Sequence, residues 1–277
     1  METKTKFLKS ELINWYSENK RNFSWRNSND PWKIFLIEIL AQQTQLERAD
    51  SYYKKFIKKY SSPDKMAEDS FSEVLKMWSG LGYNNRAKRL HDASKILANQ
   101  QFDEIYPNFE ILPGVGKYTK SALLSFSYGD KVITEDTHVN KIISRFFGVD
   151  DVNAFILENS EKLLDGVNSR DLNQSFMDFG STVCTKKNPK CSICPLSSKC
   201  KKYFTNKPSV QAKFKGSNRE IRGKILKLLS SKDKLTKNQL ATELEINKEK
   251  IELALSGLVK DGILKKSSNN NFQINSQ

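Results

Sequence analysis

The chain has 277 residues, of which 38% are hydrophobic and 28% are charged, and lysine plus arginine exceed aspartate plus glutamate by 46 to 32. This composition excludes an intrinsically disordered chain and is typical of a globular protein of one or two domains. The net charge of +14 favours a polyanionic partner such as nucleic acid, although a lysine-rich, merely solvated surface is the alternative interpretation.

The N-terminal residues METKTKFLKS lack the apolar core of a signal peptide. No stretch of the sequence approaches the roughly 20 apolar residues that span a bilayer. We therefore expect a cytoplasmic protein without a membrane partner, in which thiols stay reduced.

The stretch IFLIEILAQQTQLERA predicts a helix that ends near Gln42 and Gln43, followed by a second helix behind a Thr44–Glu47 capping box. Glu38 lies inside the apolar run of the first helix. A carboxyl group on an apolar helix face should have a raised pKa, so that it holds a proton near neutral pH and can donate it. A solvent-facing glutamate on an amphipathic helix is the alternative.

The stretch ILPGVGKYTKSALLSFSYG predicts a tight turn followed by a helix. Gly114 and Gly116 allow the backbone to turn sharply and to approach another chain closely. The free N–H groups at the start of the following helix can bind a phosphate, which fixes position without reading sequence. A plain connection between two helices is the alternative interpretation of this motif on its own.

Farther along, Asp136 precedes the helical pattern THVNKIISRFF and is a good N-cap for it.

All four cysteines of the chain lie within seventeen positions, with the spacing Cys-x6-Cys-x2-Cys-x5-Cys. Four thiolates in one short loop can enclose a tetrahedral zinc ion or an iron–sulfur cube. Zinc sites usually pair two short Cys-x2-4-Cys knuckles, and only Cys191 and Cys194 are spaced in that way here. The spacing therefore favours a [4Fe–4S] cluster over zinc or unliganded core cysteines. The predicted ligands are Cys184, Cys191, Cys194 and Cys200.

Residues 201–217 are basic and poor in apolar residues, which predicts a linker. Beyond it, the periodicity predicts helices over about 219–230, 236–244 and 248–260, and the segment GILKKSSNNNFQI predicts a β-hairpin. Three helices and a small ribbon over 218–277 resemble a winged helix, whose third helix usually faces DNA. A protein-interaction role is the alternative, because the third helix mixes acids and bases.

The order of these motifs resembles the iron–sulfur members of the helix–hairpin–helix base-excision DNA glycosylases, a superfamily that includes endonuclease III and the MutY adenine glycosylases. The resemblance runs from about Trp15 to Cys200. The segments similar to the MutY branch in particular are PWKIFLIEILAQQTQLERA, WSGLGYNNRAKRL, LPGVGKYTKSA and MDFGSTVCTKKNPKCSICPLSSKC. The resemblance implies a mainly α fold over residues 1–200, in which a helical barrel domain and an iron–sulfur domain flank a DNA-binding cleft.

The resemblance also implies a monofunctional DNA N-glycosylase of base excision repair. Glu38 matches the general acid that protonates the leaving base, and Asp136 matches the carboxylate that stabilises the sugar cation. Tyr118 stands where the endonuclease III type carries a lysine, and tyrosine cannot form an imine with the sugar. Its implied role is a hydrogen bond within the carboxylate network, without strand cleavage by a Schiff base.

The implied substrate is adenine opposite 8-oxoguanine or guanine in double-stranded DNA. The resemblance also implies a monomer that is associated with the nucleoid. A thymine or uracil mismatch glycosylase and a non-catalytic damage-binding protein are the alternatives. The residues implied to meet the DNA are Gln42, Gln43, Tyr83, Arg86, Gly114, Gly116, Lys117 and His138.

Two departures from the MutY pattern affect the expected substrate. The sequence DTHV, rather than DGNV, places His138 where an asparagine is usual. The chain is also too short for the Nudix-like domain that helps MutY proteins recognise 8-oxoguanine. We therefore expect reduced discrimination of the opposite base, with the winged-helix-like segment adding sequence-independent phosphate contacts.

Overall fold

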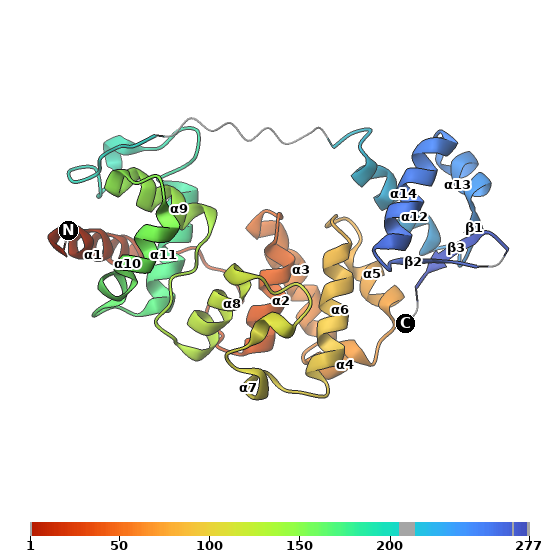
Figure 1. The fold of residues 1–277 in the computed structure, drawn as a ribbon, viewed down its shortest axis with the longest axis horizontal. Coiled ribbons are helices and arrows are strands. Elements are labelled where there is room, and N and C mark those ends of the chain that lie inside the picture. Colours follow the sequence, from red (N-terminus) through yellow and green to blue (C-terminus); the bar gives the residue numbers. More distant parts are fainter. Residues whose placement is uncertain (1, 205–213, 268, 276–277) are drawn as a thin grey trace. The chain divides into compact units, whose positions relative to one another are not determined.

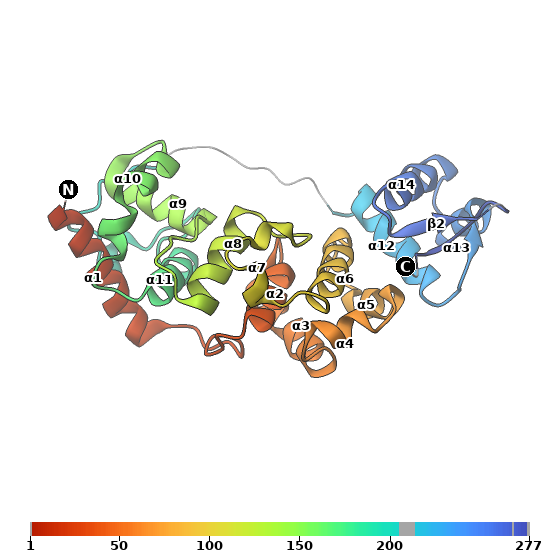
Figure 2. The same ribbon diagram turned by 60° about the horizontal axis from the view of Figure 1, so that its bottom comes forward.

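The computed structural model describes residues 2–204, 214–267 and 269–275. Residues 205–213 of the predicted linker lie outside this description. Within the described ranges the chain is mainly helical, as predicted, and its strands are three short segments near the C-terminus (Figures 1 and 2). No helix in these ranges is long and apolar enough to cross a membrane.

The chain forms two compact units whose segments alternate along the sequence. The first comprises Met1–Glu38, Pro107–Glu110 and Val115–Pro208, and the second comprises Ile39–Tyr106, Ile111–Gly114 and Ser209–Gln277. The predicted winged-helix-like segment therefore belongs to the second unit, and the predicted domain boundaries at 200 and 218 remain predictions.

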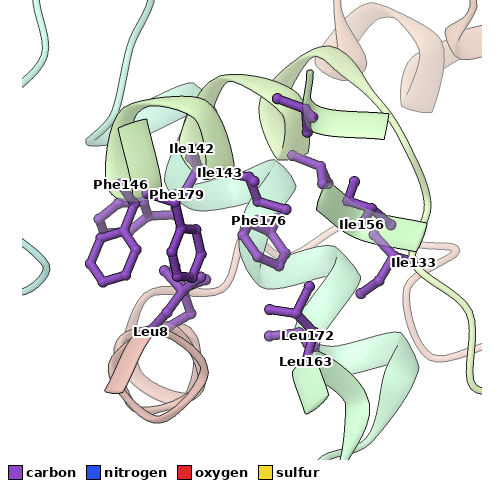
Figure 3. Close-up of a cluster of buried hydrophobic side chains, with 14 of the residues drawn as sticks. Leu8, Ile133, Ile142, Ile143, Phe146, Ile156, Leu163, Leu172, Phe176 and Phe179 are labelled. Carbon is purple, nitrogen blue, oxygen red and sulfur yellow. The ribbon is translucent and has the colours of Figure 1, made fainter. Parts of the chain in front are cut away.

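The first unit is built around four helices, α1 (Glu2–Asn19), α9 (Thr137–Ile143), α10 (Val152–Leu164) and α11 (Ser169–Thr182). It also contains most of α2 (Pro31–Ala41), α8 (Lys117–Leu123) and π-helical turns at Leu124–Tyr128 and Ser144–Gly148. Apolar side chains of the four main helices meet in one core, which includes Leu8, Phe146, Phe176 and Phe179 (Figure 3). Three of the four cysteines pack against the edge of this core. The cysteine loop is thus attached to the core of the first unit.

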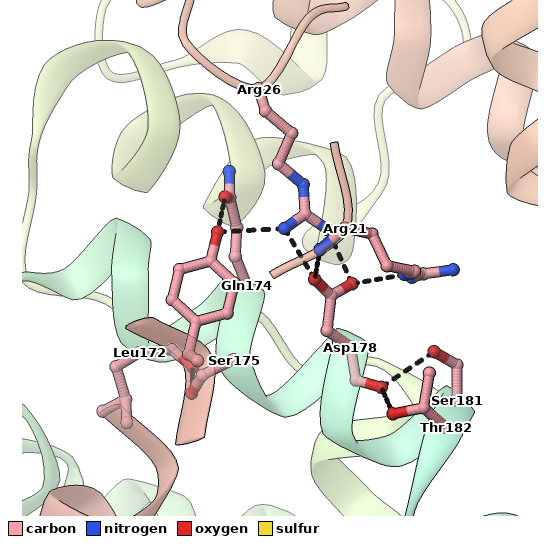
Figure 4. A network of polar contacts seen from close by, with 9 residues as sticks. Arg21, Arg26, Leu172, Gln174, Ser175, Asp178, Ser181 and Thr182 are labelled. Carbon is pink, nitrogen blue, oxygen red and sulfur yellow. Dashed lines mark hydrogen bonds and ion pairs between the residues drawn. The ribbon is translucent and has the colours of Figure 1, made fainter. Parts of the chain in front are cut away.

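A buried polar network joins α11 to the loop that follows α1 (Figure 4). Asp178 is fully buried and accepts hydrogen bonds from Arg26 Nη1 at 2.8 Å and Arg26 Nη2 at 2.7 Å. Arg21 donates to the same carboxylate from its Nε at 2.7 Å and its backbone N–H at 3.0 Å. These donors outweigh the effect of burial and hold the pKa of Asp178 below its usual range. The sequence did not predict this network.

In the second unit, α3 (Leu46–Lys59), α4 (Pro63–Ala67), α5 (Phe71–Trp78), α6 (Asn85–Leu97) and α7 (Phe102–Ile105) pack around a separate aromatic core. Phe56 meets Trp78 edge to face, with their ring centroids 5.9 Å apart.

The predicted capping box at the start of α3 is wrong. The N-cap residue is Gln45, and Thr44 Oγ1 instead donates to the Gln42 carbonyl at 3.3 Å. Helix α2 ends at Ala41, so the connection needs a turn before the new helix can begin. That turn uses the Thr44 hydroxyl and leaves it no role as a cap.

The winged-helix-like segment has the elements that the sequence predicted, namely α12 (Asn218–Leu229), α13 (Lys237–Leu244) and α14 (Lys248–Lys260). Strands β1 (Leu235–Thr236), β2 (Leu264–Lys266) and β3 (Asn271–Ile274) form an antiparallel sheet in the order β1-β3-β2. A capping box between Thr236 and Gln239 starts α13. Alternate residues of β3, Phe272 and Ile274, are buried.

We expect Asp178→Asn to lower the free energy of unfolding by about 3 kcal/mol, because the buried Arg26 and the partly buried Arg21 lose their counter-charge. The measurement is urea unfolding at neutral pH, with the exposed Asp171→Asn as the matched control. Because the folded pKa of Asp178 lies below its unfolded value, this stabilisation is full at neutral pH and is lost as the pH falls below about 4. Equal stability of the two variants would contradict the assigned role of the network.

Candidate active site and DNA-facing residues

Glu38 is carried on a helix that is apolar on every side. The residues around it in α2, from Ile34 to Leu40, are at most 1% exposed, and Glu38 itself is only 6% exposed. The alternative of a solvent-facing glutamate is therefore wrong. The carboxyl group is desolvated because the whole helix is buried.

Burial is the largest influence on Glu38 and, with the nearby charge of Asp136, raises its pKa to about 7. The Tyr118 hydroxyl donates a hydrogen bond to this carboxylate and, together with the charge of Arg26, acts in the opposite direction. Glu38 is therefore a group that is about half protonated at neutral pH. This is the property that the sequence predicted for a proton donor.

Asp136 caps α9, as predicted. Its Oδ1 accepts the backbone N–H of His138 at 2.8 Å and of Val139 at 2.7 Å. Burial raises the pKa of Asp136, and the two backbone donors lower it. The carboxylate is thus held in a fixed orientation by the helix start while it remains within electrostatic range of Glu38.

His138 lies in the first turn of the same helix and contacts Gly180 of α11. Lys141 Nζ is 3.4 Å from His138 Nδ1 and donates to the Gly180 carbonyl at 2.6 Å. A methyl group at position 180 would come within 2.6 Å of the His138 Cβ atom and 2.7 Å of Nδ1. Glycine at position 180 therefore makes room for the imidazole ring, a role that the sequence analysis missed.

Arg26 is a second site residue that the sequence did not reveal. Its charge lowers the pKa of Glu38, and its side chain is 7% exposed. Arg26 Nη1 donates to the Tyr16 hydroxyl at 2.9 Å, and that hydroxyl donates to Gln174 Oε1 at 2.6 Å (Figure 4). Among the described residues, Arg26 Nε and Gln174 Nε2 are buried donors without a hydrogen-bond partner. A buried donor of this kind destabilises the fold unless a ligand or a water molecule accepts its hydrogen bond.

The remaining predicted DNA residues are divided between the units. Gly116 and Lys117, in the first unit, are exposed where α8 begins. In the second unit, Gly114 has the left-handed φ of +94° that the predicted tight turn requires. Its carbonyl accepts Gln42 Nε2 at 3.3 Å.

Arg86 does not fit its predicted contact with DNA. It is 5% exposed, and its Nη1 atom donates to the carbonyls of Ile39 at 3.1 Å and Leu40 at 2.9 Å. Its Nη2 atom donates to the Gly82 carbonyl at 3.1 Å. Arg86 thus satisfies the free carbonyls at the end of α2, and its donors point inward.

The four predicted ligand cysteines line one cavity, together with apolar walls from Phe146, Phe179 and Leu196. They form no disulfides. Arg145 Nη1 donates to Cys184 Sγ at 3.3 Å, and the backbone N–H of Lys202 donates to Cys200 Sγ at 3.3 Å. N–H donors directed at sulfur are suited to thiolates. Among the described residues, no group of three or more metal-ligating side chains is arranged to hold a single ion.

Comparison with known proteins places this site in a family. A family model described as HhH-GPD superfamily base excision DNA repair protein matches residues 36–164, which include Glu38, Tyr118 and Asp136. An adenine DNA glycosylase of Mycolicibacterium smegmatis is 31% identical over 280 residues, covering 95% of this chain and 94% of that protein. The chain belongs to the HhH-GPD superfamily of base excision DNA repair proteins.

Two other DNA glycosylases are also similar to the chain. An adenine DNA glycosylase of Buchnera aphidicola is 36% identical over 205 residues, covering 71% of this chain but 58% of the length of that relative. The solved structure of a thermostable thymine-DNA glycosylase has a TM-score of 0.67 and 30% identity, and covers 73% of this chain and 97% of that one. This agreement confirms the predicted resemblance to the MutY-type helix–hairpin–helix glycosylases and the predicted mainly α fold.

We expect two substitutions to move the pKa of Glu38 in opposite directions. Tyr118→Phe removes a hydrogen bond to the carboxylate and should raise this pKa above about 7. Asp136→Asn removes a neighbouring negative charge and should lower it. The measurement is the pH titration of the 13C-labelled glutamate carboxyl by NMR, assigned with Glu38→Gln. Shifts of the same sign would mean that the three groups do not form one network.

Proposed function

We propose that this chain is a monofunctional adenine DNA glycosylase that acts on adenine opposite 8-oxoguanine or guanine in duplex DNA. The observation that carries the proposal is the buried Glu38 carboxyl, whose pKa of about 7 suits a general acid. Asp136 stands in electrostatic contact with it, and the adenine DNA glycosylases named above support the choice of base.

In the proposed reaction, protonated Glu38 donates its proton to a ring nitrogen of the extruded adenine. The glycosidic bond then breaks, and positive charge develops on the sugar. Asp136 faces this charge as a carboxylate held by two backbone donors, so it needs no reorganisation. Water then completes the hydrolysis at the sugar carbon, which leaves an abasic site.

The absence of lyase chemistry is also part of the proposal. Tyr118 is hydrogen-bonded to Glu38 and cannot form a Schiff base. Of the two lysines beside it, Lys120 forms an ion pair with Glu110 at 2.7 Å, and Lys117 is exposed. Neither lysine is held next to the two carboxyl groups.

A thymine mismatch glycosylase is the second candidate, because the chain is 30% identical to the solved thymine-DNA glycosylase. The need for Glu38 as a proton donor distinguishes the adenine glycosylase from the thymine glycosylase. A purine leaving group requires protonation, whereas a pyrimidine can leave as an anion with less help from an acid.

We also propose that the four cysteines hold a [4Fe–4S] cluster, as the sequence spacing predicts. Their shared, apolar-walled cavity and the donors from Arg145 and Lys202 support this assignment. The cluster would tie the 184–200 loop to the core of the first unit, and the chemistry proposed above does not pass through it.

For the cluster, the expected result is a brown protein with broad visible absorbance and about four iron atoms per chain. The measurement is metal analysis of protein purified without oxygen, with Cys194→Ser as the variant that should lose iron. One zinc ion per chain, with no iron and no colour, would contradict the assignment.

Glu38→Gln should slow adenine release by about 10²- to 10⁴-fold, because the leaving base is no longer protonated. In the unaltered protein the rate should fall as the pH rises through about 7, where Glu38 loses its proton. The measurement is single-turnover base release on A·8-oxoguanine, A·G, T·G and U·G duplexes. Cleavage of T·G or U·G by both proteins, without adenine release, would favour the second candidate.

Asp136→Asn should reduce adenine release by about 10³-fold while duplex binding is retained. Asparagine preserves the N-cap of α9 but lacks the charge that faces the sugar. Binding is measured by fluorescence anisotropy with a duplex that carries a tetrahydrofuran abasic analogue. A parallel loss of binding and activity would show that Asp136 acts mainly as a helix cap.

A further inference from the structure

Asp136 is reached through a short segment of irregular backbone. Residues 131–136 belong to no helix or strand, and they lie between the π-helical turn at Leu124–Tyr128 and the start of α9. Within this segment Thr134 is fully buried and Ile133 is 6% exposed. Buried backbone outside helices and sheets needs hydrogen-bond partners from other parts of the fold. The partners of this segment therefore fix the approach to Asp136.

One side chain of α11 supplies most of these partners. The Asn173 amide has no exposed surface. Its Oδ1 accepts the backbone N–H of Thr134 at 2.9 Å, and its Nδ2 donates to the carbonyl of Val132 at 2.8 Å. Ser169, one turn earlier in α11, donates from its hydroxyl to the same carbonyl at 3.0 Å. The segment is thus attached to α11 through its backbone.

The hydrogen bonds continue from Asn173 to the carboxylate of Asp136. The carbonyl of Thr134, whose N–H is bound by Asn173, accepts the backbone N–H of Asp136 at 2.9 Å. The Asp136 side chain then accepts two backbone N–H groups of α9. Asp136 is therefore held from both sides, by the start of its own helix and by α11 through Thr134.

Asn173 also reaches the turn that follows the helix of Tyr118. Its Nδ2 donates to Ser125 Oγ at 3.0 Å, and Ser125 Oγ lies 2.9 Å from Ser169 Oγ. Ser125 is 1% exposed and belongs to the π-helical turn that continues α8, in which Tyr118 is the second residue. One amide group therefore joins the segment that ends at Asp136 to the helix that carries Tyr118.

We propose that Asn173 is a positioning residue for the reaction, which sets the place of the Asp136 carboxylate relative to Tyr118 and the sugar. The inference rests on the proposed function, in which Asp136 faces the positive charge of the sugar. An amide suits this task because it offers donors and an acceptor without adding a charge beside the two carboxyl groups. A fixed carboxylate acts only where it meets the developing charge, and a misplacement of about 1 Å can cost about 10²-fold in rate.

A purely structural asparagine is the alternative, because any buried backbone needs partners. The two roles differ in what the loss of the side chain changes. A structural role lowers stability and weakens all complexes alike. A positioning role weakens mainly the complexes in which a positive charge stands at the sugar.

The test compares binding to two duplexes that carry an abasic analogue opposite 8-oxoguanine. One analogue is a pyrrolidine, which is cationic at neutral pH and resembles the sugar cation, and the other is the neutral tetrahydrofuran. The proteins are the unaltered chain, Asn173→Ala, Ser169→Ala, Asp136→Asn and Asn159→Ala. Asn159 is the matched control, because this amide is only 7% exposed but donates to the Phe155 carbonyl of its own helix α10, at 2.9 Å. Thermal unfolding is measured for each variant.

The unaltered chain should bind the pyrrolidine duplex more tightly than the tetrahydrofuran duplex, and Asp136→Asn should remove this preference. Asn173→Ala should reduce the preference about tenfold and single-turnover base release about 10²-fold, while affinity for the tetrahydrofuran duplex is retained. Asn159→Ala should keep the preference, even at a lower unfolding temperature.

Ser169→Ala decides the question if Asn173→Ala does not fold. This variant removes one of the two side-chain donors to the Val132 carbonyl, so the preference should fall in the same direction by about threefold, the effect of one neutral hydrogen bond.

A folded Asn173→Ala or Ser169→Ala protein that keeps the full preference would overturn the proposal and leave Asn173 a structural role. Equal weakening on both duplexes would overturn it as well. The proposed function fails in other ways. An unaltered chain without any preference for the cationic duplex would refute the role of Asp136 and the inference with it. A chain that has the preference but releases no adenine from A·8-oxoguanine would refute the substrate alone.

Discussion

The desolvation of one carboxyl group is the constraint around which the site is organised. Glu38 sits on a helix that is buried on all sides, and this raises its pKa to about 7. For an acid with a raised folded pKa, stability is lost as the pH rises from the unfolded value towards about 7. The fold therefore keeps a group that weakens it at neutral pH. A proton donor for a leaving base requires that environment, and a structural glutamate does not.

The groups around Glu38 come from separate parts of the chain and act on it in opposite directions. Tyr118, at the start of α8, and Arg26, in the loop after α1, lower its pKa, whereas Asp136, at the start of α9, raises it. Asp178 in turn holds Arg26 through two hydrogen bonds. The buried ion pair thus supports the site as well as the fold, because it fixes a positive charge near Glu38, the proposed proton donor.

The second unit uses arginine in two different ways. Arg86 is directed inward and satisfies the carbonyls at the end of α2, while Arg219 of α12 contacts the hydroxyl of Tyr83. Both arginines flank the same tyrosine ring. Arginine, which the sequence associates with phosphate, therefore also packs here against an aromatic ring.

The sequence by itself determined the features that depend on neighbours along the chain. Caps, periodicity and spacing are local, so the sequence predicted four features correctly. They are the N-cap at Asp136, the apolar helix around Glu38, the limits of α14 and the close spacing of the cysteines. Only the tertiary structure decided that Thr44 does not cap α3, that Arg86 faces inward and that Arg26 is held by Asp178, 152 residues away. The direction of a long polar side chain is set by partners distant in sequence. Burial then decides whether its charge serves the site, the fold or the solvent.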